Sequence, residues 1–400
     1  MTDIVTRLDI ENVRCISKAG LDLKGVNVLI GENGSGKSTL VECCELLRRI
    51  PSGEFFNALY SVHSGPAGLL RHGEKDLSLR VRVEDDAGVQ PTLEYEFRLF
   101  SLNGSFQIEH EHLLQGSGDS IDLSVFRGDN GNYEPTNHRS GETNAFHGFS
   151  GGEHALNKFQ HSVPSAFRMA RALERIEVHL PFDTRPTWLT RDLNRPSGMR
   201  DSVMLQPNTA LSRLGLNLPS VYHILRDRSD WNETLDLVRL GLGFEVEGIT
   251  LPADPSGERI GIGIKYRGME QAVPAYFLSE GQLSYLAFVA LRQLSDTSNC
   301  SLLCFDEPEL HLHPGTMSLV MDFFRHMGKS HPVLLATHSD VLLNHLDDPA
   351  SSAILCERRP EGSRLLRPDS AALKPWLDEY NGLGRALSEG AGDLVFREQD

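Results

Sequence analysis

The sequence lacks several features that would assign it to a membrane, secreted or metal-binding class. No stretch approaches the roughly 18 consecutive apolar residues of a membrane-spanning helix. The first residues, MTDIVTRLDIENVRC, show no basic start followed by an apolar run, as a secretory signal would. The six cysteines form no C-x-x-C pair, and several lie in apolar runs, so we expect them to be free and buried. We therefore predict a cytoplasmic protein without a membrane partner.

A surplus of basic residues is also missing. The chain has 39 Lys and Arg against 55 Asp and Glu, which gives a formal net charge of −16. Proteins that coat nucleic acid neutralise phosphates with Lys and Arg, so binding of that kind is not expected here. A local basic face stays open as an alternative, with Arg168, Arg171 and Arg175 as its candidates.

What the sequence does contain is an ordinary globular composition over 400 residues, with clear periodic segments. Residues 5–30 predict two short strands with a turn at residues 17–20. Residues 77–108 alternate with period two and predict an antiparallel meander. Residues 115–162 are rich in Gly, Ser, Asn and His and predict a long loop. Residues 277–345 predict helix, strand, helix and strand in that order.

A glycine-rich segment between a strand and a helix carries the strongest chemical signal. Gly31–Thr39, GENGSGKST, fits the pattern G-x-x-x-x-G-K-[ST], in which backbone N–H groups close around phosphate oxygens. Lys37 would reach the β and γ phosphates, Ser38 would bind Mg²⁺, and Thr39 would lie near the α phosphate. The predicted phosphate-binding residues are Asn33, Gly34, Ser35, Gly36, Lys37, Ser38 and Thr39.

Two carboxylates follow a second buried strand. The run Ser301–Pro308 reads SLLCFDEP, so Asp306 and Glu307 stand where the apolar stretch ends. Asp306 would hold Mg²⁺, and Glu307 would orient the attacking water and accept its proton. We predict ATP and Mg²⁺ as the cofactors and ATP hydrolysis as the reaction.

The segment Leu278–Gln282, LSEGQ, opens a helix with an unbroken apolar face. Ser279 is predicted to cap this helix, which leaves free N–H groups where an anion such as a γ phosphate fits. Ser279, Gly281 and Gln282 are therefore further candidates for nucleotide contact.

These motifs occur in an order that resembles the ABC ATPases. LSEGQ is similar to the LSGGQ signature, with Glu280 in place of a glycine, and Thr337-His338-Ser339 follows another apolar strand. The resemblance implies that Ser279 of one head contacts the γ phosphate held by a second head, and that His338 senses the same phosphate. It also implies a self partner, in a head-to-head dimer or higher oligomer.

Two details resemble the RecF, OLD and SMC-related branch of this group. Lys37 and Leu278 lie 241 positions apart, far more than in transporter ATP-binding subunits, and the Asp-Glu strand continues as DEPELHLHP. The opening Arg7–Arg14, RLDIENVR, is also similar, with Val13 where an aromatic residue is common. His311 and His313 belong to this pattern, which lies at the expected contact between heads, and do not indicate a metal site.

The resemblance implies an α/β fold: a P-loop core with a mixed sheet and an antiparallel meander, plus a smaller helical and mixed lobe. We expect the ATP-binding core in residues 1–183 and 276–367. Residues 184–275 would form an inserted second lobe that leads to the signature helix, and residues 368–400 a C-terminal helix and tail. No heptad pattern persists, so long coiled-coil arms are not expected.

Two parts of the family pattern have no clear counterpart. The glutamine that helps to ligate Mg²⁺ has only Gln90 and Gln115 as candidates by position, and no aromatic residue is identified for stacking on adenine. The segment Phe149–Glu153, FSGGE, also resembles a signature, but it lacks the following amphipathic helix and is interpreted as loop.

The main functional hypothesis is an ATP-driven switch that controls a separate effector or nuclease chain, as resembling ATPases do in anti-phage defence. Fewer residues follow His338 than the Toprim domain of OLD proteins needs, so the effector is expected on another chain. One alternative is a RecF-like clamp that binds DNA in repair. The least favoured alternative is the ATP-binding subunit of a transporter.

Overall fold

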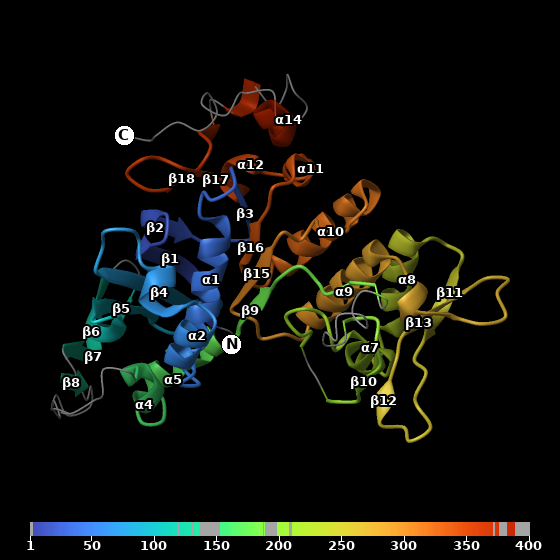
Figure 1. Cartoon of the computed structure of the whole chain (residues 1–400), viewed down its shortest axis with the longest axis horizontal. Helices are drawn as coiled ribbons and strands as arrows, with labels where there is room; N and C mark the ends of the chain where they lie inside the picture. The colour runs from blue at the N-terminus through green and yellow to red at the C-terminus, as the bar shows by residue number, and fades with distance from the viewer. Residues whose placement is uncertain are drawn as a thin grey trace.

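The computed structural model describes residues 3–117, 120–129, 132–135, 153–186, 188, 198–207, 210–370, 373–375 and 382–388. Within these ranges the chain forms two large sheets and two small ones, with helices between the large sheets and on the far side of one of them (Figure 1). The predicted α/β class, with a mixed sheet, an antiparallel meander and a smaller mixed region, is confirmed.

A six-stranded mixed sheet forms the centre of the molecule. Its order is β18(Arg364–Leu366), β17(Ala353–Glu357), β3(Val26–Ile30), β16(Val333–Ala336), β15(Leu302–Asp306) and β9(Ile176–His179). Neighbouring strands are parallel, except for β17 and β18. The central strands are continuous apolar runs because both faces of the sheet are covered. The carboxyl ends of β3, β15 and β16 meet at one edge, where Asp306 pairs with Ala336.

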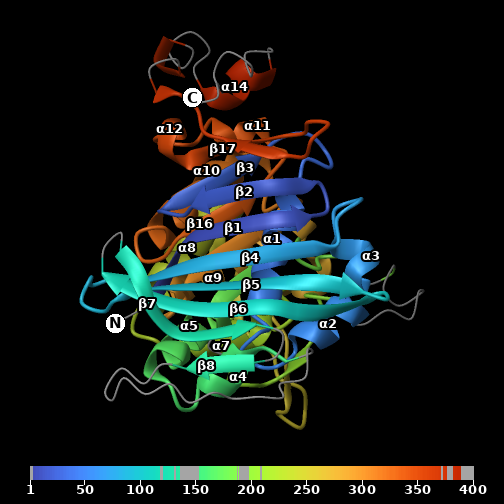
Figure 2. The same ribbon diagram turned by 90° about the vertical axis from the view of Figure 1, so that its left-hand side faces the viewer.

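A seven-stranded antiparallel sheet lies beside it and faces the viewer in Figure 2. Its order is β2(Ile16–Asp22), β1(Asp3–Val13), β4(Asp76–Asp85), β5(Thr92–Leu102), β6(Ser105–Ser117), β7(Ser120–Asp129) and β8(Asn132–Pro135). The alternating residues of the predicted meander place one apolar face inward.

Two local predictions are wrong. The first turn lies at Arg14 and Cys15, between β1 and β2, and residues 17–20 belong to β2. Arg14 takes the left-handed φ of 51°, which Gly or Asn usually adopts, so no turn signal marks the position. Within the predicted loop of residues 115–162, β7 and β8 extend the meander and α4(Ala155–Phe159) follows. A strand ladder is made by backbone groups and needs no apolar sequence when the meander supplies its neighbour.

The helices divide between two hydrophobic cores. The first core joins α1(Lys37–Leu47) and α5(Pro164–Glu174) to the seven-stranded sheet. The second core lies on the other face of the six-stranded sheet and contains α7(Leu218–Arg226), α9(Glu280–Ser295) and α10(Pro314–Met327). The central sheet therefore lies between α1, which follows the P-loop, and α9, which carries the signature (Figure 1).

The remaining named elements lie around these sheets and helices. They are α2(Phe55–Ser61), α3(Gly65–Leu69), β10(Val203–Met204), α8(Trp231–Leu242), β11(Val246–Thr250), β12(Arg259–Ile260), β13(Gly263–Tyr266), β14(Val273–Pro274), a 3₁₀ helix at Ala275–Phe277, α11(Asp340–Leu343), α12(Pro349–Ser352) and α14(Leu383–Ser388). In the described ranges no helix combines the length and apolar character required to cross a bilayer.

Candidate nucleotide site

The P-loop lies between β3 and α1, at the carboxyl edge of the central sheet. Gly34 and Gly36 have φ of 77° and 105°, the left-handed region in which glycine has no steric cost. The Lys37 ammonium donates to the carbonyl oxygens of Gly31, at 2.6 Å, and Glu32, at 2.9 Å. Burial lowers the pKa of Lys37 from its ordinary 10.5. The loop is thus closed around its own lysine.

A cavity of about 470 Å³ opens above this loop. It is lined by Arg14, Cys15, Asn33, Gly34, Gly36, Lys37, Ser38, Thr39, Glu307 and His338. The structure therefore brings most of the predicted P-loop residues together with the predicted base and the predicted phosphate sensor. Ser35 is buried and does not line the cavity. Sequence reasoning missed Arg14 and Cys15, whose place follows only from the β1–β2 turn.

Asp306 and Ser38 form the part of the site that suits a cation. Ser38 Oγ donates to Asp306 Oδ1 at 3.0 Å. Burial raises the pKa of the Asp306 carboxyl, an effect that the Ser38 hydrogen bond partly opposes and the neighbouring Glu307 reinforces. A hydroxyl and a carboxylate side by side fit Mg²⁺, which prefers oxygen ligands and commonly shares them with substrate phosphates.

Glu307 and His338 face each other across the cavity mouth. His338 Nε2 lies 3.8 Å from Glu307 Oε1, and both side chains are exposed. Glu307 has a φ of 49°, an unusual conformation for a residue with a side chain, and such strain gathers at functional sites. Its backbone N–H donates to the carbonyl oxygen of Ala336 at 2.7 Å, which fixes it against the end of β16.

Glu309 holds this arrangement together, and sequence reasoning missed it. One of its carboxylate oxygens accepts from Thr337 Oγ1 at 2.6 Å and from the His338 backbone N–H at 3.0 Å. The other carboxylate oxygen is buried with no hydrogen-bond partner. A single carboxylate thus connects the segment after β15 to the segment after β16. The DEPE spacing was the available signal, although its contact is not visible in sequence.

The signature residues line a different cavity, of about 790 Å³. Ser279, Gly281 and Gln282 all belong to it, and it shares no lining residue with the P-loop cavity. Ser279 caps α9 as predicted, in a capping box: its hydroxyl accepts from the Gln282 N–H at 3.2 Å, and the Gln282 amide oxygen accepts from the Ser279 N–H at 2.8 Å. Tyr266 holds the other end of the Gln282 amide at 3.1 Å.

The DEPELHLHP segment packs against the signature within the same chain. A Cβ at Gly281 would lie 2.7 Å from the His311 carbonyl oxygen, so this position has no room for a side chain. Glu280, which replaces the usual glycine, lies with Oε2 2.9 Å from His311 Nδ1. The departure from LSGGQ thus places a carboxylate against the His311 imidazole. His311 and His313 both line the signature cavity, and His313 also caps α10.

Arg200 is a further residue that sequence reasoning missed. Its Nη1 donates to the carbonyl oxygens of Ala275, Tyr276 and Leu278, at 3.1, 3.3 and 2.5 Å. Its Nε donates to the carbonyl oxygens of Thr184 and Arg185. Burial lowers the pKa of the guanidinium, and the charge of Glu280 opposes that shift. Arg200 therefore fixes the backbone that leads into the signature. Nothing in the local sequence marks it.

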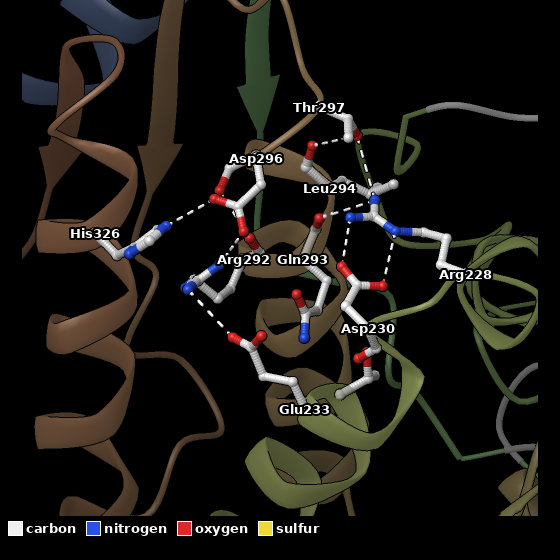
Figure 3. Close-up of polar contacts among 11 residues, drawn as sticks. Arg228, Asp230, Glu233, Arg292, Gln293, Leu294, Asp296, Thr297 and His326 are labelled. Carbon is white, nitrogen blue, oxygen red and sulfur yellow. Dashed lines mark hydrogen bonds and ion pairs between the residues drawn. The ribbon is translucent and has the colours of Figure 1, made fainter.

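The far end of the signature helix is held by charged side chains (Figure 3). Arg292 of α9 pairs with Glu233 of α8 and with Asp296, and His326 of α10 also contacts Asp296 at 2.7 Å. Nearby, Arg228 pairs with Asp230 and donates to the carbonyl oxygen of Gln293 at 3.1 Å. α9 is thus tied to α8 and α10 at the end opposite Ser279.

The remaining predicted features lie away from both cavities or outside the described residues. Neither Gln90 nor Gln115 lines the P-loop cavity, and the Gln115 amide oxygen accepts from Ser165. In the segment Phe149–Glu153 only Glu153 is described, so its interpretation as loop lies outside the described residues. The six cysteines are free, and all but Cys15 are buried.

Comparison with sequence families gives one match over most of the chain. The model of the family AAA_21, described as "AAA domain, putative AbiEii toxin, Type IV TA system", matches residues 26–344. The DNA replication and repair protein RecF of Bifidobacterium longum subsp. infantis is 34% identical over 91 residues. That alignment spans 22% of this chain and only 20% of the RecF protein.

Comparison with solved structures shows the fold. An Smc head bound to the C-terminal winged-helix domain of ScpA matches with a TM-score of 0.54 and 14% identity, over 92% of this chain and 99% of that one. An Smc head with an extended coiled coil, bound to the C-terminal domain of ScpA from Pyrococcus furiosus, matches with a TM-score of 0.52 and 13% identity, over 95% and 100%. The chain belongs to the AAA_21 family and is an ABC-type ATPase of the RecF- and SMC-related group.

Proposed function

We propose that this chain binds ATP with Mg²⁺ and hydrolyses ATP in a site that a second copy completes, and that the joined form controls a separate effector. The separation of the two cavities carries this proposal. The P-loop cavity holds Lys37, Glu307 and His338, whereas Ser279 lines a cavity with no residue in common. A nucleotide on one P-loop therefore meets Ser279 only when another head supplies it.

Each residue has a role that follows from its position. Lys37 would leave its two carbonyl partners for the phosphates, and Ser38 with Asp306 would hold Mg²⁺, whose charge would neutralise the phosphates as negative charge develops on them. Glu307 would accept the proton of the attacking water. His338, held by Glu309, would donate to the γ phosphate. Ser279 of the second head would present the N-terminus of α9 to the same phosphate.

A separate partner protein is proposed from the relatives and from the description of the family. In this proposal residues 184–275 form a second lobe that links nucleotide binding to the signature helix. The two Smc heads are described as bound to a domain of ScpA, and the family description names a toxin of a toxin–antitoxin system. Both support a head that acts through another protein, and we place that role in anti-phage defence.

DNA binding in the manner of RecF is the second candidate, favoured by the RecF alignment. Two of its three candidate arginines are already paired: Arg168 with Asp3 and Arg171 with Glu174. DNA affinity that falls steeply with salt and depends on ATP would support the clamp. Negligible binding at low salt, with or without ATP, would exclude it.

The test of the proposed function is the solution mass of the Glu307→Gln protein with and without ATP and Mg²⁺. This change removes the proton acceptor and keeps the shape of the side chain, so ATP should bind while turnover falls by about 10² to 10⁴. The protein should then double in mass when ATP and Mg²⁺ are added, because the joined state no longer decays by hydrolysis.

Two variants control this measurement. Ser279→Arg in the same background should bind ATP and remain at the mass of one copy, since a large cation would fill the contact. Glu361→Gln changes an exposed glutamate away from both cavities and should behave as the parent. A mass that ignores ATP, or normal turnover in Glu307→Gln, would contradict the proposal.

A further inference from the structure

Two aromatic side chains are exposed immediately before the signature serine. Tyr276 and Phe277 have 52% and 73% of their surface exposed, and their ring centroids lie 4.6 Å apart at an interplanar angle of 57°. They belong to the 3₁₀ helix Ala275–Phe277, which ends two residues before Ser279. Paired exposed rings beside a motif are a candidate contact surface, because lone exposed apolar residues are ordinary but a contiguous group is not.

The backbone that carries these rings is fixed. Ala275 and Leu278, on either side, are buried, and Arg200 donates to the carbonyl oxygens of Ala275, Tyr276 and Leu278. The Ala275 N–H also donates to the Ile262 carbonyl oxygen at 2.9 Å. A ligand that contacts the rings would not have to order this segment, which lowers the entropic cost of binding.

The P-loop cavity lacks the kind of group that these rings supply. Among the described residues that line it, none is Phe, Tyr or Trp, and half are the glycine, serine, lysine and threonine of the phosphate loop. The one ring in the lining is the imidazole of His338, which the proposed function assigns to the γ phosphate. Phosphate contacts are therefore provided within one head, whereas a stacking surface for a base is not. Bases bind proteins tightly through stacking on aromatic side chains.

We propose that Tyr276 and Phe277 of one head stack on the adenine of the ATP held by the P-loop of the other head. This proposal rests on the proposed head-to-head function, in which Ser279 meets the terminal phosphate of the same nucleotide. Three residues of chain span at most about 10 Å, so both rings lie within reach of a base attached to that triphosphate. Each nucleotide is then held by its phosphates in one head and by its base in the other.

The charge of the chain gives this contact a further purpose. Two copies that each carry a formal charge of −16 repel each other. Stacking on a base adds an attraction that does not depend on charge, so the rings would offset part of that repulsion. The alternative is that the two rings contact an apolar patch on the second head. In that case the rings would be equally exposed in a single head, but pairing would not depend on the base of the nucleotide.

The experiment uses the full chain with Glu307→Gln and measures the nucleotide concentration that gives half-maximal pairing. ATP is compared with ribose 5′-triphosphate, which has the phosphates and sugar without the base. Phe277→Ala and Tyr276→Ala should each raise the required ATP concentration about tenfold, because one stacked base contributes about 1 to 3 kcal/mol. Neither variant should change the concentration of ribose 5′-triphosphate that is required.

Two further variants make the result specific to stacking. Phe277→Trp keeps a ring and should restore the parent behaviour with ATP. Phe167→Ala removes a ring of comparable exposure from α5, which lies in the other core, and should have no effect. ATP binding to single heads, measured in the Ser279→Arg background, should be the same for all ring variants.

The outcomes separate this proposal from the function on which it rests. An equal loss of pairing with ATP and with ribose 5′-triphosphate would overturn it in favour of contact between the heads, and unchanged pairing with ATP would also overturn it. Absence of ATP-dependent pairing in Glu307→Gln alone would overturn the proposed function first, before any ring is changed.

Discussion

The P-loop cavity and the signature cavity are held in opposite ways. In the P-loop cavity the Lys37 ammonium donates to carbonyl oxygens of its own loop. The Asp306 carboxylate bears a burial cost that the Ser38 hydrogen bond and the nearby Lys37 and His338 offset only in part. In the signature cavity Ser279 and Gln282 satisfy each other, and Arg200 fixes the preceding backbone. If nucleotide binds as proposed, the P-loop side exchanges internal contacts for phosphate contacts, whereas the signature side keeps the contacts that it already has.

This difference separates two free energies that are easily confused. Nucleotide affinity of a single head depends on how readily the P-loop exchanges its internal contacts for phosphate contacts. In the proposed pairing of two heads, affinity depends on a surface that is already ordered in the single chain. Variants on the two sides should therefore fail in different assays, and four of them test this difference.

The largest effect is expected for Lys37→Ala. The change removes charge-assisted hydrogen bonds to phosphate, each of about 1.5 to 3 kcal/mol, so ATP affinity should fall at least tenfold. Isothermal calorimetry on single heads is the measurement, with the exposed Lys24→Ala as the control. Retained affinity would mean that the lysine keeps its two carbonyl partners in the bound state.

Arg200→Met should weaken the pairing of heads and leave ATP binding to the P-loop unchanged. It removes the Arg200 donor from the carbonyl oxygen of the buried Leu278, at about 1 to 3 kcal/mol for an unsatisfied group. The Ala275 carbonyl oxygen keeps the Leu278 N–H as a donor. The thermal midpoint should fall by several degrees, and pairing of the Glu307→Gln protein should weaken. ATP affinity of single heads should not change, and a parallel loss of that affinity would disprove the separation of the two sides.

Glu309→Ala should slow hydrolysis by about tenfold without weakening ATP binding. It removes the acceptor of the Thr337 hydroxyl and the His338 N–H, each bond contributing about 1 kcal/mol. Steady-state kinetics would show the loss in kcat, with KM unchanged. Glu309→Gln keeps an acceptor oxygen and should recover most of the rate; if it does not, Glu309 acts through its charge instead of through position.

The smallest effect concerns Asp306 and pH. Its pKa in the folded chain lies above the ordinary 3.8, so the unfolded chain releases this proton at lower pH. The nucleotide-free protein thus loses stability as pH rises from about 4 through the raised pKa. Asp306→Asn should raise the thermal midpoint at pH 7 by no more than a few degrees, and the gain should shrink at acid pH. Asp322→Asn is the exposed control, and a lower midpoint in Asp306→Asn would contradict the burial cost.

Contiguous motifs were predictable from sequence, because their function requires neighbouring residues. The P-loop, the Asp306-Glu307 pair and the cap at Ser279 each consist of a few adjacent positions between periodic segments. The fold class was implied by the resemblance that their order supports, and Ser279 caps α9 as predicted, although the full capping box with Gln282 was seen only in the structure.

What could not be predicted depends on contacts between distant segments. Arg200 contacts carbonyl groups about 75 residues further along the chain, and any arginine there would have looked the same in sequence. Glu309 meets His338 across two parallel strands, and Arg14 reaches the nucleotide cavity through a turn without a glycine. Backbone acceptors have no sequence signal, so such positioning residues appear only when the chain is folded.

The ion pairs at the far end of α9 connect the signature serine mechanically to α8 and α10. α9 is one unbroken helix of 16 residues, about 24 Å long, with Ser279 at one end and Arg292 near the other. A continuous helix moves as a rod, so a shift of α8 or α10 at Arg292 reaches Ser279 with little lost on the way (Figure 3). If Ser279 contacts nucleotide as proposed, that contact and the ion pairs of Arg292 lie at the two ends of one helix.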